Sequence, residues 1–474
     1  MRHTKLALAA MTLAVLAACG GTSPEPGNQT LRTKFSAQVT FGDSLSDVGT
    51  YAVGTVAALK GGKFTINGDN TAVNPALTGR TWTELMAAQL GLPAPCAAVT
   101  GLDGNASQGF SVPVTAHAGC YGYAQGGARV SNPVGPGNKL TGSVLGSLTY
   151  PVATQIANHL QAVGGKFKGD EIVFVMAGGN DVLYNLTALS VAATAAGQAA
   201  GAAAGAAAGA TAYGQSLVGQ LAALATNPAT AAQAIGLALA TESARAGSTQ
   251  TSVTMAAIGA AATQPGAVSA ADPAVYGPIV AKATSDATTA GNAAGAAAGA
   301  KAGADYATAH GPDLIVAMTQ AANDLVALVK TQIVANGANF VTVNNLPDVA
   351  TSPSGRAQDA PTQALINAMV SAFNTTLASG LASEPKVLLV DVFTNNHDEA
   401  TNPAPYGLTN VTDTACDLSV AKNPLQSSLV CNGGNLIAGD VSHYGFADTV
   451  HPTPFHHLLL ARYVAEKMVI KGWL

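Results

Sequence analysis

Short apolar segments followed by polar turns recur along the chain from residue 36 onward. Four of them have the length of a β-strand, are rich in Val, Ile or Phe, and are bounded by Gly, Asn, Asp or Pro. They are AQVTF at 37–41, EIVFVM at 171–176, NFVTV at 339–343 and KVLLVDV at 386–392. Such nearly continuous apolar runs are typical of strands buried on both faces of a parallel sheet. Helical patterns such as 312–337, which ends in a glycine, provide crossovers, so the sequence predicts an α/β fold.

Polar turns directly follow three of these four segments. Their sequences are GDSLSD at 42–47, AGGND at 177–181 and NNLPD at 344–348. In open α/β sheets, catalytic and binding residues gather just beyond the carboxyl ends of the strands. We therefore expect a functional site at this edge of the sheet, with Ser44 and Asn180 among its residues.

The segment between about 187 and 310 is rich in Ala, Gly and Thr. No charged side chain occurs between Asp181 and Glu242, and glycines recur every four residues at 197–209 and again at 291–303. This spacing places the glycines along one side of a helix, where a second backbone can approach closely. We expect an antiparallel helical hairpin joined along these two seams. A flexible low-complexity insertion and a membrane-inserted hairpin are the alternatives, because glycine weakens helices and Ala, Gly and Thr are only weakly apolar.

The N-terminus has the pattern of an export signal. Residues 1–18 combine a basic start with an apolar run that is short for a bilayer span. The sequence LAAC at 16–19 resembles the lipobox of bacterial lipoproteins, so we expect Cys19 to be lipidated, with 19–35 as a tether; a plain secretory signal is the alternative. This predicts an exported protein anchored to a membrane of the bacterial cell envelope, with the outer membrane as the expected site and secretion as the alternative.

The other four cysteines are even in number, as in exported proteins with disulfides. Three pairings are formally open, and we favour Cys96–Cys120 and Cys416–Cys431, because each closes a local loop rich in Gly and Asn. No CxxC or HxxxH spacing indicates a metal site, and we expect no metal or cofactor. Without Arg2 and Lys5 of the signal, 19 basic and 26 acidic residues give a formal charge of 19 − 26 = −7. This sparse, acidic charge argues against nucleic acid as a partner.

A serine nucleophile needs a base, a group that orients the base, and donors for an oxyanion. The segment FADTVHPTPFHH at 446–457 offers Asp448 and His451 three residues apart. The glycine pair Gly126 and Gly127 in YAQGGAR, and Asn180, offer N–H donors. Each motif is weak by itself, and no GxSxG nucleophile elbow occurs.

Together and in this order, GDSL, the glycine pair, GGND and DTVHP resemble the SGNH/GDSL hydrolases over residues 36–186 and 311–474. The resemblance implies a flavodoxin-like three-layer fold and acyl-ester hydrolysis without a metal. It implies Ser44 as nucleophile and oxyanion donor, His451 as base and then acid, and Asp448 as its orienting group. Asn180 and one glycine N–H complete the oxyanion hole, with Gly126 preferred over Gly127.

Three further features bear on these expectations. Asp43 and Asp181 match motif positions, and we interpret them as supports of the strand ends. The segments 345–353 and 406–416 resemble parts of bacterial lipase-like members, which favours lipid esters as substrates. The insertion at 187–310 is not part of the family's minimal pattern, and its apolar composition and its position after Asn180 suggest the hypothesis of a lid over the acyl site.

The leading functional prediction is a lipoprotein serine esterase or lipase that forms an acyl-enzyme on Ser44. Two alternatives remain. The same site would serve a carbohydrate acetyl or aryl esterase or an acyltransferase, and an inert hydrolase scaffold would serve a surface interaction protein.

Overall fold

The computed structural model describes residues 33–68, 74 and 77–474. The predicted signal, Cys19 and most of the tether lie outside these residues. The central sheet has four parallel strands in the order β1-β4-β5-β6. Their bounds are Gln38–Gly42 for β1, Ile172–Met176 for β4, Phe340–Asn344 for β5 and Val387–Val390 for β6.

The segment around Gly122 extends this sheet beyond β1. Gly122 forms a parallel bridge with Thr40, whose N–H and carbonyl bond to Tyr121 and Tyr123. If this segment is counted as the second strand along the chain, the sheet runs from it through β1, β4, β5 and β6, which is the flavodoxin-like order 2-1-3-4-5. The predicted α/β fold is confirmed. In the register, Gly42, Met176 and Asn344 stand side by side, so the turns that follow β1, β4 and β5 emerge at one edge.

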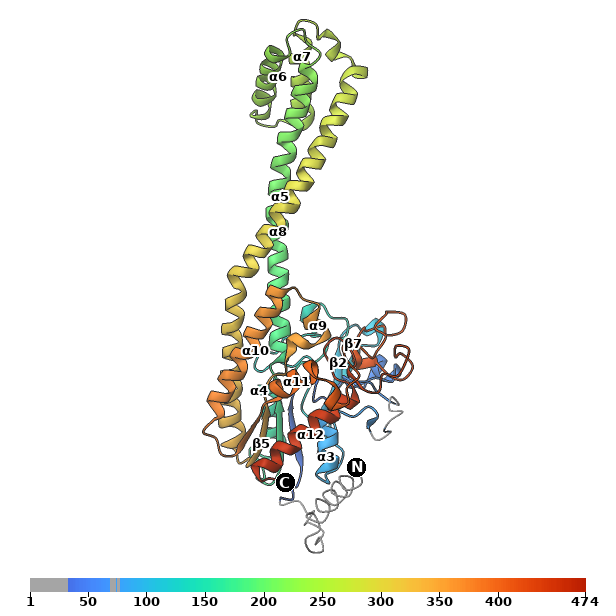
Figure 1. Ribbon diagram of the computed structural model, residues 1–474, viewed down its shortest axis with the longest axis vertical. Helices are drawn as coiled ribbons and strands as arrows, with labels where there is room; N and C mark the ends of the chain where they lie inside the picture. Colours follow the sequence, from blue (N-terminus) through green and yellow to red (C-terminus); the bar gives the residue numbers. More distant parts are fainter. Residues whose placement is uncertain (1–32, 69–73, 75–76) are drawn as a thin grey trace, which may run out of the picture.

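Helices cover both faces of the sheet (Figure 1). Side chains of β4 alternate between the faces: Val173 and Val175 enter one core, and Ile172, Phe174 and Met176 enter the other. The first core is completed by α4 (Val152–Ala162), the C-terminal part of α8 (Pro273–Leu328) and α10 (Ala360–Leu381). The second is completed by α3 (Trp82–Gln89) and α12 (Pro454–Lys471). The three-layer architecture follows from this alternation.

Smaller elements surround the carboxyl edge of the sheet. They are α2 (Gly54–Ala58), α9 (Pro353–Arg356), α11 (Val392–Thr401), the antiparallel pair β2 (Val99–Asp103) and β3 (Ser111–Ala116), and the parallel pair β7 (Asn410–Thr414) and β8 (Tyr444–Phe446). Both favoured disulfides, Cys96–Cys120 and Cys416–Cys431, are formed.

The Ala/Gly-rich segment forms the predicted antiparallel hairpin. It consists of α5 (Gly179–Ala222) and the N-terminal part of α8, and the glycine seams of the two helices face each other. A Cβ atom added at Gly201 would lie 2.8 Å from the carbonyl oxygen of Gly295, and one added at Gly205 would lie 3.0 Å from that of Gly291. Real Cβ atoms essentially never come as close as the first distance and rarely as close as the second, so glycine allows the two helices to touch.

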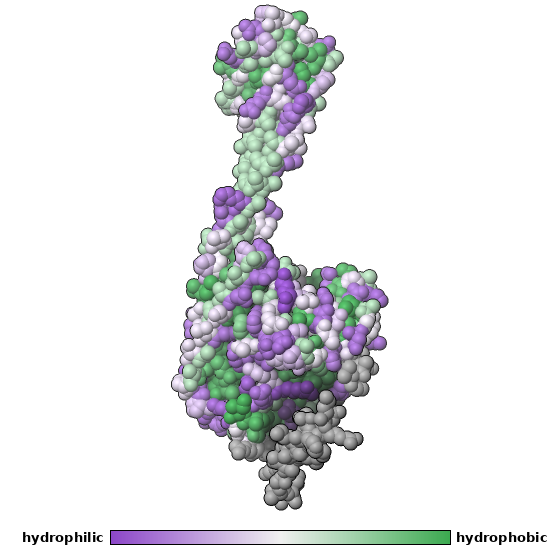
Figure 2. Space-filling view, viewed as in Figure 1, coloured by the Kyte–Doolittle hydropathy of each residue, from purple (hydrophilic) through white to green (hydrophobic). Residues whose placement is uncertain are grey.

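The hairpin is a stalk that carries a separate head (Figure 1). At its far end, α6 (Pro228–Ser243) and α7 (Gln250–Ala262) pack with the ends of α5 and α8 around a second small core, which includes Leu217, Leu221 and Ile235. Figure 2 shows a weakly hydrophobic surface along the middle of the stalk. Because the stalk points away from the sheet, the hypothesis that the insertion covers the acyl site as a lid is wrong: only its base reaches that region.

The boundaries at 187 and 310 lie inside continuous helices. The helix α5 begins at Gly179, directly after β4, and α8 continues past Pro312 to Leu328, followed by a π-helical turn at Val329–Val334. Among the described residues, two helices are long and apolar enough to cross a membrane, the stretch Pro273–Val334 and α10. The second packs against the sheet, and length and composition alone are weak evidence for a span.

Candidate active site

Ser44, His451 and Asp448 form one hydrogen-bonded chain. His451 Nε2 lies 2.9 Å from Ser44 Oγ, and His451 Nδ1 lies 2.8 Å from Asp448 Oδ2 and 2.9 Å from Oδ1. The nucleophile and its base are 407 residues apart in sequence. The structure thus brings together the three residues that the motifs predicted as the catalytic set.

The strand end explains how Ser44 is presented. Gly42, the last residue of β1, has a φ of 153°, and a Cβ atom there would lie 2.2 Å from the carbonyl oxygen of Met176 on β4. Glycine therefore permits the chain to turn at the sheet edge, so that Ser44 follows two residues later. The carboxylate of Asp43 accepts the Leu45 N–H at 3.1 Å and fixes this turn.

Three backbone N–H groups hold the carboxylate of Asp448. Its Oδ1 accepts from Val450 and His451 at 2.9 and 2.8 Å, and its Oδ2 accepts from Ser428 at 2.7 Å. Burial alone would favour the neutral acid, but the charge of His451 and these hydrogen bonds hold the pKa of Asp448 well below its usual range. Asp448 is therefore an anion that can stabilise an imidazolium.

The same pair determines the basicity of His451. Burial alone lowers the pKa of this imidazole, but the charge and hydrogen bond of Asp448, together with the charge of Asp43, outweigh it. The net effect is a pKa above the ordinary value for histidine. Phe64 covers one side of the imidazole, with ring centroids 4.9 Å apart, which keeps the ring oriented toward Ser44.

Candidate oxyanion donors come from three segments that line one cavity. Within the described part of the chain, the backbone N–H groups of Ser44 and Gly127 have no hydrogen-bond acceptor. The side-chain amide of Asn180, in the first turn of α5, donates one N–H to the Ala128 carbonyl at 2.9 Å and has a second N–H left. All three residues lie at the same cavity. They can hydrogen-bond a negative oxygen beside Ser44.

The preference for Gly126 over Gly127 is corrected by one hydrogen bond. The Gly126 N–H donates to Asp47 Oδ2 at 2.9 Å, so it is occupied inside the fold. Gly127, with a φ of 80°, takes the left-handed conformation that follows. Among the described residues, the N–H that this turn leaves available to a substrate is therefore that of Gly127.

A comparison with protein-family models agrees with this geometry. Residues 39–217 match the model of the GDSL-like Lipase/Acylhydrolase family. These residues form a domain of the SGNH/GDSL hydrolase family. The matched range contains Ser44, Gly127 and Asn180 and ends inside α5, whereas Asp448 and His451 lie beyond it. A search of curated proteins found no match to the chain. As a GDSL hydrolase, the protein acts on esters as an acylhydrolase.

Buried carboxylates support the oxyanion side of the GDSL site. Asp181 accepts the Arg129 Nε–H at 2.9 Å and the Val130 N–H at 3.1 Å, which holds the segment after Gly127. Burial raises the pKa of Asp181 despite the charge of Arg129. Asp47 was missed in the sequence, although it lies in the GDSLSD turn. It accepts N–H groups from Gly49, Thr50 and Gly126, and burial raises its pKa to about 6.

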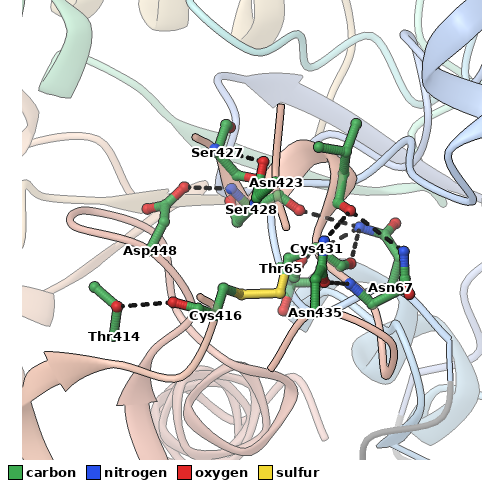
Figure 3. The surroundings of a disulfide bond; sticks show 12 residues. Thr65, Asn67, Thr414, Cys416, Asn423, Ser427, Ser428, Cys431, Asn435 and Asp448 are labelled. Carbon is green, nitrogen blue, oxygen red and sulfur yellow. Dashed lines mark hydrogen bonds between the residues drawn. A yellow bond between two sulfur atoms is a disulfide. The ribbon is translucent and has the colours of Figure 1, made fainter. Parts of the chain in front are cut away.

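A loop closed by a disulfide supports Asp448 (Figure 3). The Cys416–Cys431 bond ties down the loop that carries Ser428, whose N–H bonds to Asp448. Asn67 joins this loop to the segment that carries Phe64. Its amide donates to the carbonyls of Ser428 and Cys431 at 3.2 and 3.1 Å, and its own N–H donates to Cys431 at 2.7 Å. No side-chain motif identifies these contacts, because most of them are to backbone groups.

The two histidines that follow the catalytic one serve the fold. His456 Nε2 lies 2.9 Å from Glu399 Oε2, and its Nδ1 lies 2.9 Å from the Gly445 carbonyl. His457 Nδ1 accepts the Trp82 N–H at 3.3 Å. Among the described residues, no group of three His, Cys, Asp or Glu side chains is arranged to hold a metal ion.

A cavity of about 310 Å³ opens at Ser44. The catalytic residues form its polar side. Its apolar side chains come from the sheet edge, the helices and the loops around it: Leu45, Phe64, Leu145, Met176, Leu183, Leu346, Val349, Val392, Phe446, Val450 and Leu460. An apolar pocket beside a nucleophile and its oxyanion donors fits the acyl group of an ester.

Proposed function

We propose that this GDSL hydrolase cleaves carboxylic esters with aliphatic acyl groups, as a lipase or lipid esterase, through an acyl-enzyme on Ser44. The observation that carries the proposal is the apolar lining of the 310 Å³ cavity at Ser44. Sites for small molecules have volumes of roughly 300–1,000 Å³, so a cavity of this size accepts an acyl group much larger than acetyl. An acetyl group would leave most of this apolar surface uncovered.

The geometry supports a two-step reaction. His451 Nε2 accepts the proton of Ser44 Oγ as the oxygen attacks the ester carbonyl carbon, and Asp448 stabilises the imidazolium. The carbonyl oxygen becomes an oxyanion bound by the donors of Ser44, Gly127 and Asn180. His451 then returns the proton to the departing alkoxide, which leaves as an alcohol. Water repeats the sequence on the acyl-enzyme, releases the carboxylic acid and restores Ser44.

Hydrolysis of p-nitrophenyl esters from acetyl to palmitoyl tests this proposal. We expect the highest kcat/KM with medium or long acyl groups, and loss of activity in Ser44→Ala and His451→Ala. Labelling with a p-nitrophenyl phosphonate, which reacts with an activated serine, should modify the wild type once and leave Ser44→Ala unmodified. Activity on acetyl esters alone would contradict the lipid assignment and favour a carbohydrate acetyl esterase.

We also propose that a lipid on Cys19 anchors the chain to the bacterial cell envelope, with the outer membrane as the expected site. The LAAC sequence supports this placement, and the two disulfides are in keeping with an oxidising compartment. Growth with a labelled fatty acid should label the wild-type chain and leave Cys19→Ser unlabelled. Equal labelling of both would contradict the anchor.

A further inference from the structure

One carboxylate oxygen at the cavity has no hydrogen-bond partner. Asp348 lies in the turn NNLPD after β5 and lines the cavity at Ser44, and its side chain is 5% exposed. Its Oδ2 lies 2.7 Å from Nδ1 of His397 on α11, whereas its Oδ1 is buried and unpartnered. Among the buried, unpartnered side-chain atoms of the described residues, this oxygen alone belongs to a residue that lines the cavity. A buried acceptor without a partner is costly, which indicates a donor that binds in the cavity.

Glu399 on α11 provides a direct comparison with Asp348. It also lines the cavity, and its side chain is 4% exposed. Its Oε1 accepts a hydrogen bond from Asn395 Nδ2 at 2.8 Å, and its Oε2 lies 2.9 Å from His456 Nε2. Glu399 therefore has a partner inside the fold for each oxygen, whereas Asp348 has a partner for one oxygen only. This contrast assigns Glu399 to the fold and leaves Asp348 Oδ1 to a ligand.

The order of the strands separates Asp348 from the nucleophile. β5 is the second strand away from β1, so the carboxyl ends of these two strands are about 10 Å apart. The turns that follow them carry Asp348 and Ser44, and both residues line the same cavity. Because the reacting carbonyl group lies at Ser44, the group that Asp348 binds belongs to another part of the substrate.

A hydroxyl group is the donor that fits a single free carboxylate oxygen. It has one O–H to donate, whereas a primary ammonium has three N–H groups and would leave some of them unpaired in a mainly apolar cavity. A quaternary ammonium has no donor at all. A phosphate group would need a cationic partner, and no Lys or Arg of the described residues lines the cavity. The chemistry of the cavity therefore favours a neutral hydroxyl.

We infer that Asp348 Oδ1 accepts a hydrogen bond from a hydroxyl group of the ester substrate, so that the enzyme prefers esters with a free hydroxyl near the ester bond. The hydroxyl belongs either to the alcohol, as in a glycerol monoester, or to the acyl group, as in a 3-hydroxyacyl ester. The inference rests on the proposed function and names a specificity-determining residue outside the catalytic set. A hydrogen bond to a charged group should raise kcat/KM by about tenfold to 100-fold over an analogue that lacks the hydroxyl.

Four small esters test the inference on the full-length enzyme: propyl butyrate, 1-butyrylglycerol, propyl 3-hydroxybutyrate and butyrylcholine. We expect the wild type to prefer at least one of the two hydroxylated esters over propyl butyrate by at least tenfold, and the preferred ester locates the hydroxyl. Butyrylcholine should show no such advantage, and an advantage that Asp348→Leu abolishes would assign the site to a cation and overturn the inference.

Variants of the two cavity carboxylates show which group causes the preference. Asp348→Leu should reduce the preference for the hydroxylated ester to less than twofold. Asp348→Asn should give an intermediate value, because its amide can still bond to His397 but carries no charge. Glu399→Gln is the matched control and should retain the wild-type preference. A ratio of two kcat/KM values does not depend on how much of a variant is folded. No preference in the wild type, or the same preference in Asp348→Leu, would overturn the inference.

A binding measurement separates this inference from the proposed function. Ligand-observed NMR measures the Kd of propyl butyrate and of the two hydroxylated esters for Ser44→Ala, which cannot form an acyl-enzyme. We expect a hydroxylated ester to bind at least tenfold more tightly than propyl butyrate, and this difference should be lost in Ser44→Ala/Asp348→Leu but kept in Ser44→Ala/Glu399→Gln. If the wild type cleaves no ester but this pattern holds, the proposed function fails and the role of Asp348 stands. If esters are cleaved and the hydroxyl gives no advantage in rate or binding, the inference fails alone.

Discussion

The backbone N–H of Ser428 donates a 2.7 Å hydrogen bond to Oδ2 of Asp448, and Ser428 lies three residues before the half-cystine Cys431. The position of the catalytic carboxylate therefore depends on a loop that a disulfide closes. In many proteins a disulfide mainly constrains the unfolded chain. Here it also constrains a group that contacts the catalytic set.

The first prediction concerns this disulfide. The double variant Cys416→Ser/Cys431→Ser should lower kcat/KM by about tenfold to 100-fold, because a small displacement of Asp448 misaligns His451. It should also lower the free energy of unfolding by about 3 kcal/mol, because a crosslink across a loop of this length reduces the entropy of the unfolded chain by about that amount.

The matched control is Cys96→Ser/Cys120→Ser. This disulfide spans 24 residues, and neither of its cysteines lines the cavity, so its loss should cost similar stability and leave kcat/KM within about twofold. Both variants should be assayed well below their unfolding temperatures. Equal losses of activity would show that the Cys416–Cys431 bond has no specific effect on the site.

The second prediction concerns Asn180. Removing its amide in Asn180→Ala should lower kcat by about 10²- to 10³-fold with little change in KM, because the donor acts on charge that develops in the transition state. Asn185→Ala on the same helix, which is outside the cavity lining, is the control and should retain full activity. A change confined to KM would instead assign Asn180 to ground-state binding.

The third prediction concerns pH. His451 must be neutral to accept a proton, and Asp448 raises the pKa of this imidazole. The value of kcat/KM should therefore rise with pH, and the midpoint of the rise should lie above 6.5, the ordinary pKa of histidine. In Asp448→Asn the negative charge is gone, so the midpoint should fall below the wild-type value and the plateau should drop about 10³- to 10⁴-fold. A profile measured with a butyryl ester from pH 5 to 9 decides this, and an unchanged midpoint would contradict the assigned coupling.

The fourth prediction concerns the glycine seam. A methyl group in Gly201→Ala would meet the Gly295 carbonyl oxygen at 2.8 Å, so the helices must separate, which should destabilise the stalk by about 1–3 kcal/mol. Gly219 lies on the same helix, and no atom lies within 4 Å of a Cβ atom added there. Because alanine favours a helix more than glycine does, Gly219→Ala should stabilise the stalk by about 0.5–1 kcal/mol. Helical circular dichroism on heating measures both. The same sign for the two changes would refute the seam.

Much of the fold could be predicted because each strand carries its own apolar pattern. The run EIVFVM became β4, with side chains alternating between the two cores, and its turn delivered Asn180 to the site. The packing of the seam glycines could be predicted because a spacing of four residues places them on one side of a helix. The boundaries could not be predicted, because the composition changes near residue 310 while the helix α8 continues through that point without a break.

The supporting residues could not be predicted for a different reason. Ser428 acts through its backbone N–H, which every residue but proline possesses, so no residue type marks the position. Phe64 reaches His451 from a segment almost 390 residues away, and only the folded chain shows that contact. The choice between Gly126 and Gly127 depended on where the carboxylate of Asp47 points.

The helix α5 has Asn180 as its second residue and reaches the head without interruption at its other end. At 1.5 Å per residue, its 44 residues form a rod of about 66 Å. The head and Asn180 therefore lie at the two ends of one continuous helix. If the helix does not bend, a tilt of the head displaces its first turn, which carries the Asn180 amide that lines the cavity at Ser44.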